Sequence, residues 1–304
     1  MTKDFDTEDL PQSVKDWVAQ GHAFDFNGHT VFVHSSGPTG KEGVLIVHGY
    51  PGSSWDWNNV IPPVAAQTRV VAPDMIGYGQ SDKPLVGTYK ENFSLMMQAD
   101  MFEAVVAQER LETVVLVAHD MGQSVGLELM ARQDAGKLPF RIKHAIVLNG
   151  STMVDMVELS DMQKTFLAGP DVSATDRIPR DKIAAGMRDT YGPKCSNADE
   201  FLDCQAAQIR AKKGDLVMGQ QIRYLAERKE FYDRWVGTLT GFRTAPMTVI
   251  WGTSDPIAIE AMADRIKLWR PATDVYKLAG VGHWPSLEAP EFITDTILHR
   301  LPAI

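Results

Sequence analysis

Cysteine, excess positive charge and long apolar runs are all scarce in this sequence, and each scarcity excludes a class of protein. The two cysteines, Cys195 and Cys204, are too few for a disulfide framework and have no histidine or cysteine at metal-ligand spacing. We therefore expect ordinary thiols and no metal site. The 39 acidic residues outnumber the 30 basic ones, giving a net charge of −9, which argues against a nucleic acid or an anionic membrane as the main partner.

Export, membrane insertion and a nucleotide cofactor are not indicated either. Residues 1–12 are acidic and lack the apolar core of a signal peptide, and no stretch approaches about eighteen uninterrupted apolar residues. The cytoplasm is therefore the predicted location. Gly77-Tyr78-Gly79 lacks the spacing of a nucleotide-binding loop, so no cofactor is expected. What the sequence does contain is 304 residues, 44% of them hydrophobic, enough for a large α/β domain with or without an insertion.

Short apolar runs alternate with helical patterns along most of the chain, which is typical of a mostly parallel central sheet flanked by helices. Two opening strands, 22–26 and 29–34, flank Asn27-Gly28, a two-residue hairpin signal. Later strands are expected at 44–47, 69–72, 114–118, 142–148, 247–251 and 275–278, and helices at 13–19, 55–66, 94–110 and 288–301. Functional loops should follow the carboxyl ends of these strands.

Between residue 151 and about residue 240 the strand pattern stops and the sequence becomes charged and helical. Helical spacing is present at 177–188 and 222–235, with turn signals at Gly192-Pro193 and 212–215. An insertion that leaves a strand at its carboxyl end would cover the neighbouring loops as a lid. The predicted domains are therefore a core in two parts, 1–150 and 241–304, and a helical lid, 151–240.

The buried strand expected at 114–118 stops abruptly at His119-Asp120-Met121-Gly122, where a helical pattern begins. Small residues, Ala118 and Gly122, stand two positions on either side of Asp120. A sharp strand-to-helix turn requires this spacing, because larger side chains there would collide with neighbouring main chain. The sequence therefore predicts a nucleophile elbow that carries an aspartate in place of a serine.

Two further polar residues follow later strands in the order expected of a catalytic triad. Asp255 comes after the strand at 247–251, and His283 comes after the strand at 275–278. Either residue alone has a simpler explanation, since an aspartate at a strand end often caps a helix and a lone histidine is often structural. The chain order of nucleophile, acid and histidine nevertheless predicts a triad of Asp120, Asp255 and His283.

Five motifs together resemble those of a known group of enzymes. They are HGYPGSS at 48–54, DMIGYGQSDKP at 74–84, VAHDMG at 117–122, WGTSDP at 251–256 and GVGHWPSLEAP at 280–290. Over nearly its whole length the chain resembles the epoxide hydrolase and haloalkane dehalogenase branch of the α/β-hydrolase superfamily. The stretch RYLAERKEFYDRWVGTL at 223–239 is also similar to the lid end of the epoxide-hydrolase-like mesoderm-specific transcript protein. The resemblance implies the α/β-hydrolase fold with a helical lid.

A carboxylate at the elbow dictates a particular chemistry. It is ionised at neutral pH and can attack an electrophilic sp³ carbon without a base, as in the opening of an epoxide or the displacement of a halide. The resulting ester to Asp120 must then be hydrolysed, which requires His283 as general base and Asp255 to orient the ring and stabilise the imidazolium. The main-chain N–H groups of Tyr50 and Met121 are expected to hold the oxyanion.

The residues at Tyr50 and Met121 also separate the possible substrates. Haloalkane dehalogenases of this branch use a tryptophan after the nucleophile and often an asparagine in the His-Gly-x-Pro loop, whereas fluoroacetate dehalogenases have an arginine after the nucleophile. A thioether donates no hydrogen bond, so a halide site in this chain would have to use Trp235 or Trp284. Epoxide opening instead needs a phenol, with a pKa near 10, to protonate the alkoxide.

The lid offers Tyr191, Tyr224 and Tyr232 as proton donors. Tyr224 is preferred, because its distance before the strand at residue 247 is closest to that of the second lid tyrosine of epoxide hydrolases. The first lid helix, 161–167, carries Phe166 and no tyrosine, so the family's pair of lid tyrosines is incomplete. The predicted pocket is lined by Phe166, Tyr191, Tyr232, Trp235 and Trp284.

The predicted activity is hydrolysis of apolar epoxides to vicinal diols. The alternatives are a haloalkane dehalogenase with an atypical halide site and a non-catalytic, ligand-binding member of the fold. The expected partners are a small hydrophobic substrate and water, with no nucleic acid and no membrane. The chain is expected to be a monomer or a homodimer.

Overall fold

Eight strands form one twisted sheet in the computed structural model, which describes residues 5–157, 159 and 161–301. The strands are β1 (Gly21–Phe26), β2 (His29–Ser36), β3 (Glu42–Val47), β4 (Arg69–Pro73), β5 (Thr113–His119), β6 (Arg141–Leu148), β7 (Met247–Gly252) and β8 (Asp274–Leu278). Their order across the sheet is β1-β2-β4-β3-β5-β6-β7-β8. Only the pairings of β2 with β1 and β4 are antiparallel, so the predicted mostly parallel sheet is confirmed.

The opening hairpin turns at Asn27-Gly28, as the sequence predicts. Both residues have positive φ, 52° and 85°, and the register pairs Phe26 with His29, as in a tight two-residue hairpin. The strands β3 to β8 all run parallel to one another, and β4 pairs antiparallel only with β2. The carboxyl ends of the parallel strands therefore meet at one edge of the sheet, where functional loops are expected.

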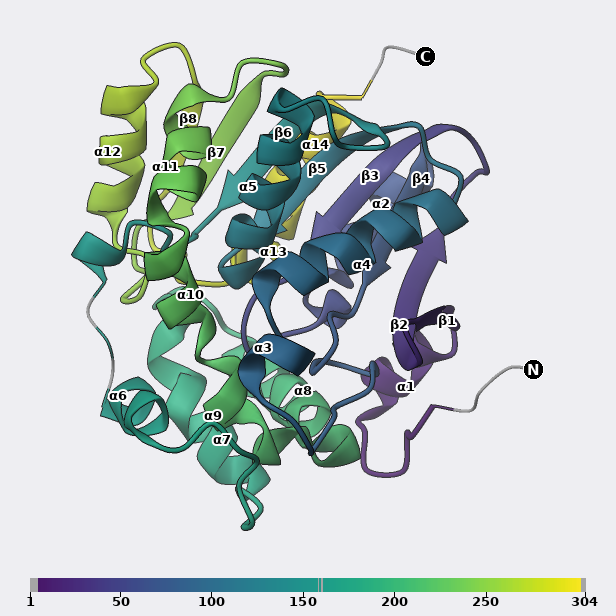
Figure 1. Cartoon of the computed structure of the whole chain (residues 1–304), viewed down its shortest axis with the longest axis vertical. Coiled ribbons are helices and arrows are strands. Elements are labelled where there is room, and N and C mark those ends of the chain that lie inside the picture. The colour runs from purple at the N-terminus through teal and green to yellow at the C-terminus, as the bar shows by residue number, and fades with distance from the viewer. Residues whose placement is uncertain (1–4, 158, 160, 302–304) are drawn as a thin grey trace.

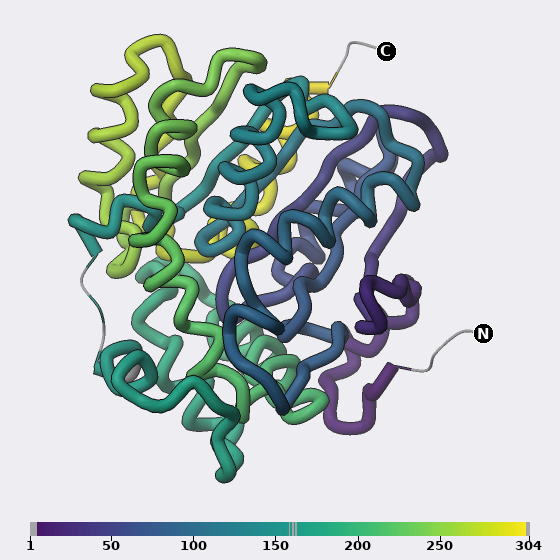
Figure 2. Tube along the Cα trace, viewed as in Figure 1, coloured from purple at the N-terminus to yellow at the C-terminus, as the bar shows by residue number. Residues whose placement is uncertain are grey.

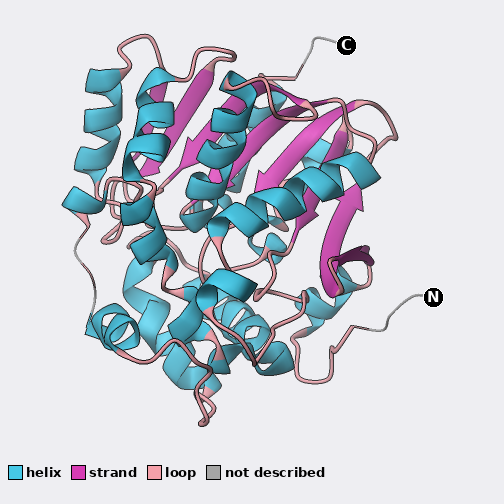
Figure 3. Cartoon of the chain, viewed as in Figure 1, coloured by secondary structure: helices cyan, strands magenta, loops and turns pink. Residues whose placement is uncertain are grey.

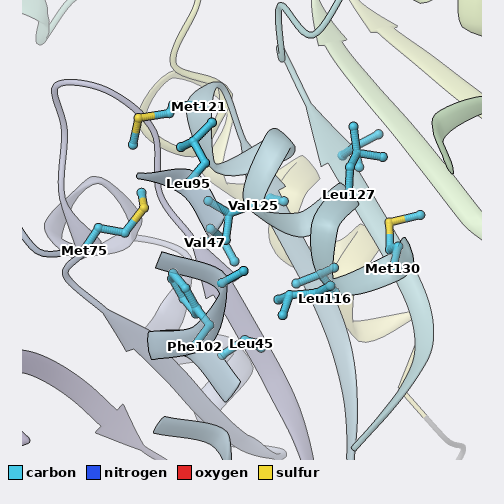
Figure 4. Packing of buried hydrophobic residues seen from close by; sticks show 14 of the residues in the cluster. Leu45, Val47, Met75, Leu95, Phe102, Leu116, Met121, Val125, Leu127 and Met130 are labelled. Atoms are coloured by element: carbon cyan, nitrogen blue, oxygen red, sulfur yellow. The ribbon is translucent and has the colours of Figure 1, made fainter. Parts of the chain in front are cut away.

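Helices cover both faces of the sheet, in front and behind in Figures 1 and 3. The front layer has α4 (Leu95–Gln108), α5 (Met121–Asp134), α11 (Tyr232–Gly241) and α12 (Glu260–Trp269); the other has α1 (Gln12–Val18), α2 (Ile61–Ala65) and α14 (Pro290–Leu298). Side chains alternate along each strand, so Leu45 and Val47 enter one buried cluster and Val44 and Ile46 the other. Figure 4 shows the first cluster, with Phe102 and Val125 from the front helices packed near strand residues.

The chain between β6 and β7, residues 149–246, forms a helical insertion. Before α11 it contains η2 (Val154–Met156), α6 (Asp161–Ala168), α7 (Arg180–Met187), η3 (Arg188–Thr190), α8 (Ala198–Arg210), η4 (Ala211–Leu216), α9 (Met218–Gln221) and α10 (Tyr224–Glu230). The helices α6 to α10 lie beyond the carboxyl ends of the strands, in the lower part of Figures 1 and 2. The insertion is therefore placed over the edge where the loops meet.

Two helices expected to be continuous are broken. The region 55–66 forms η1 (Ser54–Trp57) and α2, because Pro62 and Pro63 have no N–H groups and fit only the first turn of a new helix. The region 222–235 divides at Phe231 into α10 and α11. The remaining short helices are α3 (Tyr89–Asn92) and α13 (Pro285–Glu288). None of the helices in the described part of the chain is both long and apolar enough to cross a bilayer.

Candidate active site

Asp120 lies on the sharp turn between β5 and α5, as predicted from the sequence. Its φ of 49° and ψ of −117° are a conformation that residues with a Cβ rarely adopt. The turn brings α5 so close to β3 that a Cβ at Gly122 would overlap the carbonyl oxygens of Val47 and His48. The Asp120 N–H donates to the Leu148 carbonyl at 3.2 Å, which fixes the turn against β6.

The Asp120 carboxylate is buried, and its two oxygens have different surroundings. The main-chain N–H of Tyr50 donates to Oδ2 at 2.9 Å. The other oxygen, Oδ1, lies 3.8 Å from Nε2 of His283. Met121 is the first residue of α5, so its N–H belongs to the unpaired first turn of that helix. One oxygen is thus held by main-chain N–H, while the other faces the histidine.

His283 is oriented from the side opposite Asp120. Its Nδ1 donates to Oδ2 of Asp255 at 2.7 Å, whereas its buried Nε2 has no hydrogen-bond partner among the described residues. Burial opposes the imidazolium, but the charge and hydrogen bond of Asp255, followed by the charge of Asp120, outweigh it and raise the pKa of His283 to about 9. The structure therefore brings together the three residues that the sequence predicts as a triad.

Asp255 is itself held by main-chain and side-chain donors. Its Oδ1 accepts from the N–H groups of Ile257 and Ala258, at 2.7 and 3.1 Å. Its Oδ2 accepts from Nδ2 of Asn149 at 2.7 Å, and Asn149 Oδ1 in turn accepts from the Gly252 N–H at 2.8 Å. These bonds fix the direction of the carboxylate toward His283.

Two other histidines near the site act as links between loops. His48 donates from Nδ1 to the Gly49 carbonyl and accepts at Nε2 from the Met75 N–H, both at 2.9 Å. His119 donates from Nε2 to the carbonyl of His283 at 2.6 Å. Burial lowers the pKa of both rings, that of His119 to about 4. Both rings are therefore neutral at pH 7. His48 links the loop after β3 to the loop after β4, and His119 links the elbow to the loop of His283.

A cavity of about 610 Å³ opens above Asp120 between the core and the insertion. The described residues that line it are Tyr50, Pro51, Asp120, Leu159, Gln163, Phe166, Ile178, Lys182, Ile183, Gly186, Met187, Asp189, Thr190, Met218, Tyr224, Pro256, Ile257, His283 and Trp284. Most of these side chains are apolar or aromatic. The lining includes the expected pocket residues Phe166 and Trp284, and the expected proton donor Tyr224.

The other three aromatic residues expected in the pocket are not part of this lining. Tyr191 is buried, and its hydroxyl donates to Oε1 of Gln205 at 2.9 Å. Tyr232 contacts Asp155 near the surface. Trp235 lies on α11, which packs on α5, and its indole N–H donates to Glu128 at 3.1 Å. The prediction required all three side chains to face the site from the lid. In the structure each of them contacts another partner instead.

Three phenols surround the carboxylate. The rings of Tyr50 and Tyr224 both line the cavity, with centroids 5.6 Å apart. Burial and then the charge of Asp120 raise the pKa of each hydroxyl, that of Tyr224 well above 10. Beneath them, the buried Tyr78 hydroxyl donates to Sδ of Met121 at 3.4 Å. The phenols of the site therefore keep their protons throughout the ordinary pH range.

Sequence reasoning missed three residues of the site: Tyr78, Asn149 and Arg228. The sequence around Tyr78 indicated only a glycine-containing loop. Asn149 had a usable signal, because it directly follows the strand expected at 142–148, where functional polar residues gather. Arg228 lies in a helical pattern that gives no sign that its side chain reaches Asp120 across 108 positions in the sequence.

Comparisons with known proteins agree on one family. A family model described as the alpha/beta hydrolase fold matches residues 43–290. A protein named putative hydrolase LipZ, from Mycobacterium tuberculosis, is 33% identical over 289 residues, covering 95% of this chain and 98% of that protein. The human mesoderm-specific transcript homolog protein is 30% identical over 295 residues, covering 92% of this chain and 85% of that protein. The resemblance inferred from the motifs is thereby confirmed.

Solved structures show the same fold at lower sequence identity. Haloalkane dehalogenase DbeA from Bradyrhizobium elkani has a TM-score of 0.72 at 20% identity, covering 92% of this chain and 98% of that one. Epoxide hydrolase CorEH has a TM-score of 0.64 at 20% identity, covering 92% and 97%. At these identities the likeness concerns the fold alone, and the fold class predicted from the sequence is confirmed.

Proposed function

The chain belongs to the α/β-hydrolase family, and from that premise we propose that it is an epoxide hydrolase that works through an ester to Asp120. The proposal rests on the different surroundings of the two Asp120 oxygens. An ester formed at Oδ1 leaves Oδ2 as the carbonyl oxygen beside the Tyr50 N–H. That donor is then in place for the oxyanion that develops when water attacks the ester. A serine in this position would have no second oxygen to occupy the site.

In each step of the proposed reaction a named residue donates or accepts the proton or the electron pair. Oδ1 of Asp120 attacks a ring carbon, the carbon–oxygen bond of the epoxide breaks, and the alkoxide takes the Tyr224 phenol proton. His283 next removes a proton from water, whose oxygen adds to Cγ of Asp120. The tetrahedral intermediate then breaks its bond between Cγ and Oδ1, and His283 returns the proton to the leaving oxygen. The product is a vicinal diol, and the proton left on the Asp120 carboxyl group returns to Tyr224 through solvent.

The surroundings of Tyr224 support its assignment as proton donor. Its ring lines the cavity together with Asp120, and the charge of Asp120 contributes to the raised pKa of its hydroxyl. A phenol with a raised pKa stays protonated and is still a far stronger acid than an alkoxide's conjugate alcohol. Tyr50 adds a second phenol from the core, although the first lid helix has none. We infer that the insertion acts as a cap over a small apolar substrate.

The alternative of a haloalkane dehalogenase requires donors for a departing halide. Both candidate indoles already donate to protein groups: Trp235 to Glu128 at 3.1 Å and Trp284 to Oγ1 of Thr190 at 2.8 Å. Trp235 is also outside the lining of the cavity. The thioether of Met121 has no proton to donate. These contacts favour epoxide opening, in which the leaving oxygen needs a proton and not a halide site.

A comparison of two phenylalanine variants tests the proposal. Wild-type enzyme should open styrene oxide faster than it releases halide from 1-bromobutane or 1-chlorohexane. Tyr224→Phe should lower the rate of epoxide opening by about a hundredfold or more, since general acids contribute roughly that much. Tyr232→Phe, outside the cavity, is the matched control and should keep wild-type activity. Faster halide release than epoxide opening, or full activity of Tyr224→Phe, would contradict the proposal.

A further inference from the structure

Arg228 is a fully buried cation bonded to the main chain of the nucleophile. It lies on α10 of the insertion, and none of its side chain is exposed. Its Nη2 donates to the main-chain oxygen of Asp120 at 2.9 Å and its Nε to Oγ of Ser124 at 2.9 Å. Its Nη1 donates to Oγ of Ser151 at 2.7 Å. The guanidinium thus joins the elbow, the first turns of α5 and the segment after β6.

These hydrogen bonds go to neutral oxygens, and Arg228 forms no salt bridge with a described carboxylate. The carboxylate next to it in sequence faces elsewhere, because Glu227 accepts from the Leu95 N–H and the Ser94 hydroxyl at 2.7 Å, and from the Tyr89 hydroxyl. A buried charge without a counter-ion is costly. A positive charge at this point therefore lowers the stability of the fold.

The charge of Arg228 acts close to Tyr224 and to the main chain of Asp120. Its guanidinium carbon lies 4.6 Å from the centre of the Tyr224 ring, one helical turn earlier on α10. On the pKa of Tyr224, which burial raises most, Arg228 and Asp120 act in opposite directions: Asp120 raises it and Arg228 lowers it. The guanidinium is also bonded to the main chain of the residue whose carboxylate attacks. Its charge is thus held on the residue that carries the attacking carboxylate.

We propose that Arg228 is a positioning residue that favours hydrolysis of the Asp120 ester over its formation. The proposal rests on the ester mechanism given above. A positive charge stabilises the free carboxylate, which is the ground state for attack on the epoxide, and this opposes ester formation. By lowering the pKa of Tyr224 the same charge assists the proton donor of that step, so its net effect on ester formation is small. It stabilises the oxyanion that appears when water adds to the neutral ester, and this speeds hydrolysis. The fixed charge therefore favours hydrolysis over formation and keeps the ester from accumulating.

The two steps can be separated in single turnovers of the full-length enzyme with styrene oxide. Ester is followed by intact-protein mass spectrometry and diol by chromatography. In Arg228→Met the ester should form at about the wild-type rate and disappear about tenfold or more slowly, so that it accumulates. Glu227→Gln is the matched control, because it removes a buried charge from the same helix but on the side facing α4. It should not change the ratio of the two rate constants.

Arg228→Lys tests the same claim in a protein that keeps the charge. Its ratio of hydrolysis to formation should stay close to the wild-type value even if both rates fall, and this holds as a test where Arg228→Met does not fold. Equal slowing of both steps in Arg228→Met, or the same behaviour in Glu227→Gln, would mean a structural role only and would overturn the proposal. His283→Gln separates this failure from failure of the ester mechanism: it should trap ester whatever Arg228 does, and no ester in that variant would refute the mechanism itself.

Discussion

At the scale of single residues, the charge on His283 depends on two carboxylates, only one of which keeps its charge during the proposed reaction. Burial opposes the protonated ring, while Asp255 and then Asp120 favour it, so its pKa is raised to about 9. In the proposed reaction Asp120 becomes a neutral ester, whereas Asp255 stays charged. The pKa of His283 should therefore fall when the ester forms. The first half of the reaction thus prepares the general base that the second half needs.

Asp120→Asn reproduces that loss of charge and gives a pH prediction. Because folding raises the pKa of His283 above its ordinary 6.5, the protonated ring stabilises the fold fully below pH 6.5, and this stabilisation is lost as the pH rises through about 9. In Asp120→Asn the loss should occur at lower pH. NMR titration of the His283 ring, with free energies of unfolding measured from pH 6 to 10, checks both. An unchanged pKa in the variant would show that Asp120 does not control His283.

At the scale of elements, the elbow depends on how closely α5 approaches β3. Gly122 permits that approach, since its Cα faces the carbonyl oxygens of Val47 and His48. The contact holds Asp120 in its positive-φ conformation and sets the first turn of α5 beside the Tyr50 loop. The spacing of small residues around Asp120 was enough to predict this turn from the sequence.

Substitution of Gly122 by alanine should destabilise the enzyme, because the added methyl group meets main-chain atoms that cannot move independently. We expect a loss of about 1–3 kcal/mol in the free energy of unfolding, typical of overpacked sites. Gly237→Ala in α11 is the control: nothing lies within 4 Å of its new Cβ, and the helix should gain about 0.5–1 kcal/mol. Urea unfolding of both variants gives the comparison. Wild-type stability of Gly122→Ala would contradict the close packing.

The same elements show what could be predicted from the sequence and why the rest could not. Strands and the elbow follow from local patterns of apolar and small residues, so the sheet and the places of Asp120, Asp255 and His283 along the chain were accessible. Contacts between distant segments leave no such pattern. Arg228 reaches Asp120 only because α10 packs against the elbow, and Trp235 is outside the pocket only because α11 packs on α5. The helical pattern at 222–235 gave no sign that this region divides into α10, which contacts the elbow, and α11, which packs on α5.

At the scale of the whole molecule, the active-site cavity belongs to neither part of the chain alone. The core supplies Tyr50 and Asp120, while the insertion supplies Phe166, Met218 and Tyr224. The cavity is mostly apolar inside a molecule whose net charge is −9. Both features favour a neutral, apolar substrate, because a charged one would lose its hydration on entering and would be repelled at long range if anionic.

Styrene oxide and phenylglycidate form a pair that tests this preference, since they share a skeleton and differ by one carboxylate. We expect kcat/KM for phenylglycidate to be at least about a hundredfold lower, because burying an unpaired carboxylate costs several kcal/mol. Lys182 lies exposed in the cavity lining, so Lys182→Met should be measured beside wild type to separate attraction at the entrance from desolvation inside. Similar values of kcat/KM for the two epoxides would argue against an apolar substrate class.

The ester at Asp120 is the central claim, and the position of one oxygen atom tests it most directly. Enzyme in excess over styrene oxide is allowed a single turnover in ¹⁸O-labelled water, and the peptide containing Asp120 and the diol are then analysed by mass spectrometry. The ester mechanism predicts one labelled oxygen in Asp120 and an unlabelled diol, because the diol takes its new oxygen from the carboxylate. Label in the diol and none in Asp120 would mean direct attack by water and would contradict the mechanism.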